Sequence, residues 1–293
     1  MLPAIFNKYF SMERWRVGVY ESESDELNSS VINDLVLKAN WLEIDGADFE
    51  ADPFVLFVNE ERFICYEKLN YVNGNAKLEC IDLNLNKYNI FDEVNSVTGH
   101  KSFPSIFYKD DQIYCIPETS DLNRLDLFKF DYQKFKFSYD KTLLKGEDYC
   151  DSVIFEKNGL MYLFTSTTTK PYVQQLFICE TNDFCFQPHI ESPISTSVHN
   201  GRNAGNVVEI DNAPYRVCQD CSSTYGGGVK FMKIIEISKH KYSEKSSNIT
   251  INNFHLTGVH TFNFTKGTIC LDGKTNVYGL SVFLKKIIKS LRS

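Results

Sequence analysis

The segment Cys150–Ser166 has the sequence CDSVIFEKNGLMYLFTS. Two apolar runs rich in β-branched and aromatic residues flank Asn158-Gly159, a dipeptide that strongly favours a two-residue hairpin turn. Polar residues, Asp151 and Ser166, stand at the outer ends of the two runs. The segment therefore predicts an antiparallel β-hairpin whose two outer ends lie together.

The same pattern recurs about every fifty residues through the chain. Each copy has an apolar run, a turn-forming stretch and a second apolar run. The first runs begin near Asp52, Phe103, Asp151, Gly205 and His260. Because a four-stranded propeller blade takes roughly 40–50 residues, the five copies predict an all-β chain folded as a five-bladed β-propeller.

The propeller is expected to fill residues 1–281 as a single domain, with a strand near 15–20 completing the last blade. Residues 282–293 (VFLKKIIKSLRS) form a basic amphipathic tail. Such a tail suits contact with a membrane surface or a partner, and a terminal helix packed on the propeller is the alternative.

The hairpins predict which polar residues meet. Residues at equal distances from a turn lie opposite each other in an antiparallel pair. The expected pairs are Asp52 with Glu67, Phe103 with Glu118, Asp151 with Ser166, Gly205 with Asp220 and His260 with Asp272. The charged or polar ends should therefore form a carboxylate-rich ring at one mouth of the central channel, on a rigid scaffold.

Three acids of this ring are candidate catalytic residues. Asp52 starts an apolar strand, where a desolvated carboxylate can act as base or nucleophile. Glu118 and Asp151 border apolar runs and are candidate general acids. Glycosyl chemistry needs two carboxyl groups about 5–10 Å apart, and a channel mouth can provide that separation. For any one of them, the alternative is a strand-end acid that simply faces water.

Further residues near this mouth are candidates for substrate binding: Glu67, His100, Arg202, Asp220, Tyr225 and His260. Arg202 suits a phosphate or carboxylate on a ligand, or it pairs with one of the acids. Tyr225 precedes three glycines, in a loop that either lets backbone approach a ligand or is a flexible turn. The histidines suit sugar or phosphate contacts, with a structural role as the alternative.

Composition limits the classes of partner. The chain of 293 residues has 31 basic and 38 acidic residues, a net charge of −7, which argues against a nucleic-acid-binding surface. Its apolar runs are too short to cross a membrane, and the start MLPAIFNKYF lacks the parts of a secretory signal. With nine cysteines in largely apolar surroundings, we expect a cytoplasmic protein, in solution or at the inner face of the membrane.

Cofactor motifs are absent from the sequence. Cys218 and Cys221 have the spacing of half a zinc or redox site, but no second half accompanies them, so a structural role is favoured. There is no dinucleotide fingerprint, P-loop or nucleophile elbow. We therefore expect no cofactor and no dedicated metal site, with a divalent metal in the channel left open.

Several short motifs occur in a characteristic order: Asp52-Pro53-Phe54, His100-Lys101-Ser102-Phe103-Pro104, Ile116-Pro117-Glu118, Asp151, Arg202-Asn203-Ala204-Gly205-Asn206, Gln219-Asp220-Cys221 with Tyr225-Gly226-Gly227, and Gly258-Val259-His260-Thr261. Over roughly residues 15–275 this set resembles the N-terminal β-propeller domain of the glucosamine inositolphosphorylceramide transferase family. Bacterial relatives of that domain occur among surface-polysaccharide genes.

The chain is more distantly similar to five-bladed glycoside hydrolases of the arabinanase, xylosidase and invertase type. That similarity implies an Asp as base or nucleophile, a second Asp that tunes pKa values and a Glu as acid. Only Asp52 matches, because Phe103 and Asp151 stand where the second Asp and the Glu would be. This departure argues against simple hydrolysis.

Three functions follow as hypotheses. The preferred one is a glycosyltransferase that passes an activated sugar to a glycan or glycolipid acceptor in cell-surface polysaccharide synthesis, such as capsule, O-antigen or glycolipid assembly. The second is a glycoside hydrolase of the propeller type. The third is a non-catalytic glycan-binding or scaffold module.

Overall fold

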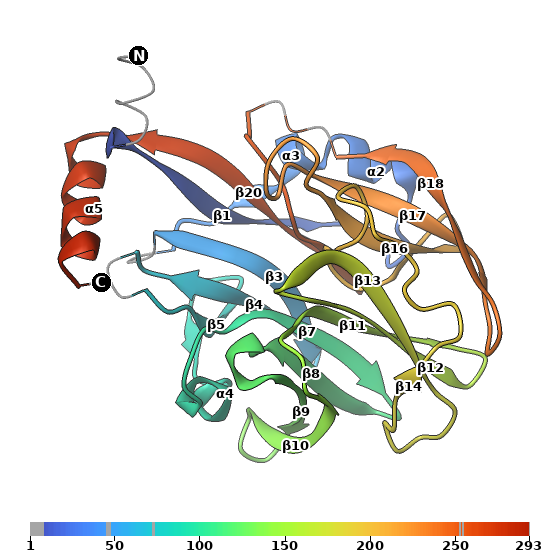
Figure 1. Ribbon diagram of the computed structural model, residues 1–293. Coiled ribbons are helices and arrows are strands. Elements are labelled where there is room, and N and C mark those ends of the chain that lie inside the picture. The colour runs from blue at the N-terminus through green and yellow to red at the C-terminus, as the bar shows by residue number, and fades with distance from the viewer. Residues whose placement is uncertain (1–8, 45–47, 72–73, 252, 254, 293) are drawn as a thin grey trace.

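Five four-stranded antiparallel sheets are arranged in a ring, as the blades of a propeller (Figure 1). The computed structural model describes residues 9–44, 48–71, 74–251, 253 and 255–292. The predicted all-β, five-bladed β-propeller is confirmed.

Each of the first four blades is one consecutive stretch of chain. The first contains β3 (Phe49–Val58), β4 (Glu61–Leu69), β5 (Lys77–Asp82) and β6 (Lys87–Tyr88). The second contains β7 (Ser102–Lys109), β8 (Gln112–Glu118), β9 (Arg124–Asp131) and β10 (Lys136–Lys145). The third contains β11 (Tyr149–Lys157), β12 (Leu160–Thr167), β13 (Lys170–Cys179) and β14 (Gln187–Pro188). The fourth contains β15 (Val208–Ile210), β16 (Ala213–Asp220), β17 (Gly228–Ile237) and β18 (Tyr242–Thr250).

The fifth blade joins the two ends of the described chain. Its strands are, from the channel outward, β19 (Phe262–Thr265), β20 (Thr268–Tyr278), β1 (Ser11–Glu21) and β2 (Asn40–Trp41). The remaining elements are α2 (Ser29–Asn33), α3 (Leu35–Lys38), α4 (Asp92–Ser96), the 3₁₀ turn η1 (Ser120–Leu122) and α5 (Leu280–Arg292). Helix α5 thus begins just before the expected tail and includes most of it.

The five innermost hairpins turn through two residues that both have positive φ. These dipeptides are Asn59-Glu60, Asp110-Asp111, Asn158-Gly159, Asp211-Asn212 and Lys266-Gly267. Two consecutive positive φ values define the hairpin turn whose twist matches that of the strands, and Asn, Asp and Gly tolerate it best. The repeat of turn-forming dipeptides is therefore the local cause of the repeat of blades.

The expected pairing at the strand ends is wrong by one residue, because a β-bulge follows each of the first three strand starts. Asp52, Phe103 and Asp151 have φ values of 50°, 44° and 47°, and the register shifts beside each of them. The residues that lie opposite Glu67, Glu118 and Ser166 are instead Ala51, Ser102 and Cys150. Because a bulge bends the strand and changes the direction of a side chain, the side chains of Asp52, Phe103 and Asp151 point in other directions than those of their strand neighbours.

In the fourth and fifth blades the expected pairing is also wrong by a small shift, because the turn of the fourth blade lies one position before its assumed centre and that of the fifth half a position after. Val208 pairs with Tyr215, and Phe262 pairs with Leu271. Gly205 and His260 precede the strands rather than lying inside them. The strand starts nevertheless remain on the same end of the ring.

The ring closes through polar contacts next to the channel. Asn263 of β19 donates through its side-chain amide to the carbonyl oxygen of Pro53 at 2.8 Å, which joins the fifth blade to the first. Across the channel, Asn206 donates to the carbonyl oxygen of Ile106 at 2.7 Å. These amides satisfy backbone carbonyl groups where different blades meet beside the channel.

Candidate active site at the channel mouth

The channel mouth brings together polar side chains from all five blades. Asp52 and Glu67 come from the first blade, His100 and Glu118 from the second and Asp151 from the third; Arg202 and Tyr225 come from the fourth, and His260 and Asp272 from the fifth. We call this set the mouth ring. Every site residue predicted from the sequence belongs to the mouth ring, except Asp220.

One half of the mouth ring is built around His260. Its Nε2 lies 3.4 Å from Asp52 Oδ1, and its Nδ1 lies 2.5 Å from Asp272 Oδ2. Asp272 also accepts the backbone N–H groups of His260, Thr261 and Asp52 at 2.8, 3.0 and 3.1 Å. The Thr261 hydroxyl donates to Asp52 at 2.7 Å. The bulge at Asp52 thus places its carboxylate against the histidine of the last blade.

Burial and charge set the protonation of this half. Burial opposes a charged His260, but the carboxylates of Asp272 and Asp52 outweigh it and raise its pKa to about 9. Burial raises the pKa of Asp52 to about 7, despite the positive charge of His260, and nearby carboxylates add to the rise. Near neutral pH, Asp52 is therefore poised to gain or lose a proton beside an imidazolium.

The other half of the mouth ring is built around Asp151. Its Oδ2 forms an ion pair with Nε of Arg202 and lies 3.5 Å from Nε2 of Gln219. Its backbone N–H donates to Glu118 Oε2 at 3.4 Å, and its carbonyl oxygen accepts from the Asn203 amide at 2.7 Å. Of the two roles left open for Arg202, the structure shows the pairing with an acid.

The second acid of this half, Glu118, has a strongly shifted pKa. Burial raises the pKa of Glu118 to about 8, and the negative charges of Asp151 and Asp52 add to the rise while Arg202 opposes it. At neutral pH Glu118 is therefore mostly a neutral carboxylic acid. A protonated carboxyl next to a carboxylate held by a guanidinium is the division of roles that acid–base catalysis requires.

Aromatic and histidine side chains form the accessible wall. His100 Nε2 lies 3.2 Å from Glu67 Oε1, and the His100 side chain is 36% exposed. Burial opposes its protonation, but Glu67, Glu118 and Asp52 raise its pKa overall. Tyr225 is 44% exposed, and its ring packs on the Arg202 guanidinium at 5.3 Å. The acids are 8% exposed or less, so a ligand would meet His100 and Tyr225 first.

Asp220 lies at the edge of the mouth and outside the mouth ring. Lys230 binds its carboxylate at 2.8 Å and His199 Nδ1 lies 3.2 Å away. Partial burial would raise its pKa, but the hydrogen bonds from Lys230 and Ser222 prevail and lower it to about 2. Gln219, its neighbour on β16, points inward instead because successive side chains of a strand face opposite sides.

Among the residues that the structure describes, two groups have the donor spacing for a metal ion: Asp52 with His260 and Asp272, and Glu118 with Cys150 and Asp151. Both already contain a positive charge of the chain, the imidazolium of His260 and the guanidinium of Arg202. Burial raises the pKa of the Cys150 thiol well above its ordinary value, so that it remains a poor ligand. The donor sets therefore fit internal charge balance better than a metal ion.

Phe103 takes the bulge position of the second blade. It is fully buried and packs edge-on against Phe54, with 4.9 Å between ring centroids. The mouth therefore has no acid at this position, as the sequence predicts.

Sequence reasoning missed four supporting residues: Trp15, Asn203, Gln219 and Thr261. Trp15 is 1% exposed, and its ring lies 4.0 Å from the ring of His260. Nothing in its sequence neighbourhood indicates this contact, because β1 and His260 lie at opposite ends of the chain. Asn203 and Gln219 flank residues that the sequence did nominate, and strand alternation was the available signal for Gln219.

Comparison with solved structures shows the same architecture. The chain superposes on an α-L-arabinofuranosidase from Podospora anserina in complex with cellotriose, with a TM-score of 0.58 and 10% identity over 77% of this chain and 82% of that one. It also superposes on an exo-β-1,3-galactanase from Clostridium thermocellum, with a TM-score of 0.53 and 14% identity over 88% of this chain and 62% of that one. At such identities the likeness shows the fold alone.

Comparison of sequences identifies the family. The chain is 26% identical over 224 residues to glucosamine inositolphosphorylceramide transferase 1 of Oryza sativa subsp. japonica, and 24% identical over 208 residues to that of Arabidopsis thaliana. These alignments cover 70% and 68% of this chain but 29% and 27% of the relatives. A family model, glucosamine inositolphosphorylceramide transferase 1, N-terminal, matches residues 15–268. The chain therefore belongs to this family of N-terminal propeller domains.

Proposed function

We propose that the protein is a carbohydrate-active enzyme that transfers a glycosyl unit from an activated sugar donor to a glycan or glycolipid acceptor at the channel mouth. The observation that carries the proposal is the pairing of Glu118, whose pKa lies at about 8, with Asp151 bound by Arg202. A neutral carboxylic acid next to a second carboxyl group held in an ion pair is suited to breaking and forming a glycosidic bond.

Each group has a role in the proposed reaction. Glu118 donates a proton to the departing oxygen, and it takes a proton from the incoming hydroxyl only where Asp52 acts as the nucleophile rather than as the base. Asp52, with a pKa of about 7, acts as the base or nucleophile, and the imidazolium of His260 stabilises its charged form. Tyr225 and His100 contact the sugar at the exposed wall.

Transfer is preferred to hydrolysis on two grounds. The named relatives are transferases, although the chain matches less than a third of their length. The acid of the second blade is replaced by the buried Phe103, which departs from the hydrolase pattern. We place the reaction in cell-surface glycan assembly on the cytoplasmic side, where nucleotide-activated sugars are the natural donors.

A second candidate function is glycan binding without chemistry. The observation that favours it is burial: Asp151 and His260 are each 2% exposed and Asp272 is fully buried, so several acids of the mouth ring have structural partners rather than open faces. In that case His100 and Tyr225 would supply the binding contacts. The two functions differ in turnover. An enzyme should lose turnover in Glu118→Gln, whereas a binding module has no turnover in any variant and keeps its binding.

The test combines binding and turnover. Thermal-shift measurements against a panel of nucleotide sugars and oligosaccharides identify a ligand, and product formation is then followed with that ligand. Glu118→Gln keeps the shape of the neutral acid, so we expect normal folding with turnover lowered by about 10²-fold or more. Glu180→Gln, in an exposed ion pair with Lys239, is the matched control and should remain active.

The outcomes separate the candidates. Turnover that survives Glu118→Gln unchanged would refute the catalytic role of Glu118. Binding without turnover in the unmodified protein would favour the glycan-binding function. A panel in which no nucleotide sugar and no oligosaccharide stabilises the protein would refute both.

A further inference from the structure

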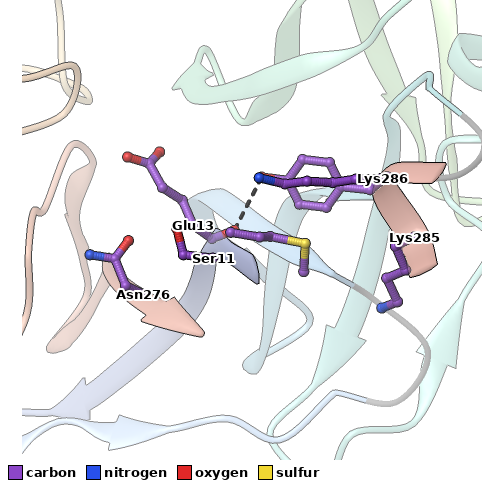
Figure 2. A pocket seen from close by; sticks show the side chains of 7 residues that line it. Ser11, Glu13, Asn276, Lys285 and Lys286 are labelled. Carbon is purple, nitrogen blue, oxygen red and sulfur yellow. Dashed lines mark hydrogen bonds between the residues drawn. The ribbon is translucent and has the colours of Figure 1, made fainter. Parts of the chain in front are cut away.

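Helix α5 stands apart from the blades at the end of a long two-stranded ribbon made by β1 and β20 (Figure 1). A few contacts fix it there: Val282 is buried, Phe283 stacks on Phe10 with 4.9 Å between centroids, and Lys285 pairs with Asp48. A pocket of about 370 Å³ lies beside the helix, between Lys285 and Lys286 on one side and β1 on the other (Figure 2). The helix is thus held in a defined position.

The apolar side of α5 faces away from the protein. Leu280, Leu284, Ile287, Ile288 and Leu291 are 66%, 52%, 39%, 41% and 81% exposed. Their spacing places them along one stripe of the helix, with Val282 on the opposite side. A helix of a globular domain normally buries such a stripe against the core. Here the rest of the protein contacts the side of α5 that carries Val282, and the broad apolar stripe remains exposed.

The charge of α5 is opposite to that of the rest of the chain. Its sequence, LSVFLKKIIKSLR, has four basic residues and no acidic residue, whereas the whole chain has a net charge of −7. In the helical spacing the basic residues fall on the side opposite the apolar stripe. An apolar stripe opposed by a basic side is typical of helices that lie at the boundary between anionic headgroups and acyl chains. Among the described residues no helix is both long and apolar enough to span a bilayer, so the contact would lie at the surface.

The ribbon also fixes where the helix lies relative to the mouth ring. Strand β20 runs from the turn at Lys266-Gly267 to Asp272 in the mouth ring, and then continues to Tyr278 just before α5. The helix therefore lies beyond the mouth, on the same side of the propeller. A surface that receives α5 would face the opening of the channel.

We propose that α5 docks the protein on an anionic lipid surface, with the stripe Leu280, Leu284, Ile287, Ile288 and Leu291 inserted at the headgroup level and the channel mouth turned toward the membrane. The docking itself stands on the helix alone. The added inference that the acceptor is a membrane-embedded glycolipid rests on the proposed function.

The test is co-sedimentation of the full chain with vesicles of phosphatidylcholine, with and without phosphatidylglycerol, neither containing a glycolipid. We expect binding that needs phosphatidylglycerol and weakens with added salt. Leu284→Glu with Leu291→Glu should lower the vesicle-bound fraction by about tenfold or more, because two inserted apolar groups become charged. Leu37→Glu, at a position 59% exposed on α3, is the matched control and should bind normally.

Three results would overturn the docking. The first is failure to bind vesicles that contain phosphatidylglycerol. The second is equal binding by the double variant, provided that its thermal unfolding matches that of the parent protein. The third is a dimer in solution that the same double variant abolishes, since the stripe would then cover a second copy. None of these results depends on catalytic turnover, so failure of the proposed function would remain a separate finding.

Discussion

Replacing Arg202 with Met should leave the buried carboxylate of Asp151 without its cationic partner. Asp151 is 2% exposed, and its only cationic partner among the described residues is Arg202, whose side chain is 15% exposed. Methionine keeps much of the volume and the apolar stem but removes the charge and all the donors. After the change, Asp151 would keep the long contact from Gln219 at 3.5 Å and the neighbouring acid Glu118.

The size of the loss follows from this geometry. Removing one partner of a buried ion pair costs about 3–5 kcal/mol. Partial exposure of Arg202 and the remaining amide reduce this to about 2–4 kcal/mol. For a chain of this size such a loss lowers the melting temperature by roughly 3–7 °C.

Urea unfolding of four proteins measures the effect: the parent, Arg202→Met, Asp151→Asn and the double variant. We expect the double variant to be more stable than Arg202→Met, because an amide tolerates burial without a cation. Lys239→Met, which breaks the exposed pair with Glu180, is the control and should unfold like the parent. The reasoning fails if Arg202→Met unfolds like the parent, or if the two changes simply add.

Two further predictions concern the same end of the propeller. Raising the pH from about 6 to about 9 should lower the melting temperature, because the folded protein holds protons on His260 (pKa about 9) and Glu118 (pKa about 8) that the unfolded chain releases at lower pH. Differential scanning fluorimetry measures the melting temperature across this range, and His260→Gln should make it depend less on pH. A melting temperature of the parent protein that does not change with pH would contradict the prediction. Gly205→Ala should cost about 1–3 kcal/mol in urea unfolding, because Gly205 has a φ of 147° and a Cβ there would stand 2.1 Å from the carbonyl oxygen of Phe262. Gly228→Ala, where a Cβ meets no atom within 4 Å, is its control, and equal stability of the two variants would rule out this account.

The sequence predicts the ring of blades because its decisive signals are local. Asn158-Gly159 and its four counterparts are turn-forming dipeptides, and the structure gives both residues of each a positive φ. The positions of the strand starts follow from these turns. Asp52, Glu118 and Asp151 therefore lie at one mouth, as the periodicity alone suggests.

The rest depends on contacts between distant parts of the chain. The bulges beside Asp52 and Asp151 change the register by one residue, and no nearby residue type announces them. Arg202 pairs with Asp151 rather than standing free for a ligand, and this pairing is a tertiary contact between two blades. Asp220 was expected in the mouth ring because it ends a strand, but alternation along β16 sends Gln219 inward instead.

The fifth blade has a consequence for how the protein is made. Lys274 of β20 binds Glu13 of β1 at 3.2 Å, although 261 residues separate them. During synthesis, β1 leaves the ribosome before the four continuous blades, with only the short strand β2 available beside it, and it pairs with β20 only after those blades have been made.

Folding should therefore be sequential, with the four continuous blades forming early and the last joining only at the end. Contacts of such long range make the final step slow, and the edge of β1 that β20 later covers stays exposed until then. Once joined, however, the blades cannot separate without breaking the pairing of β1 with β20. The same strand that delays assembly should then also slow unfolding.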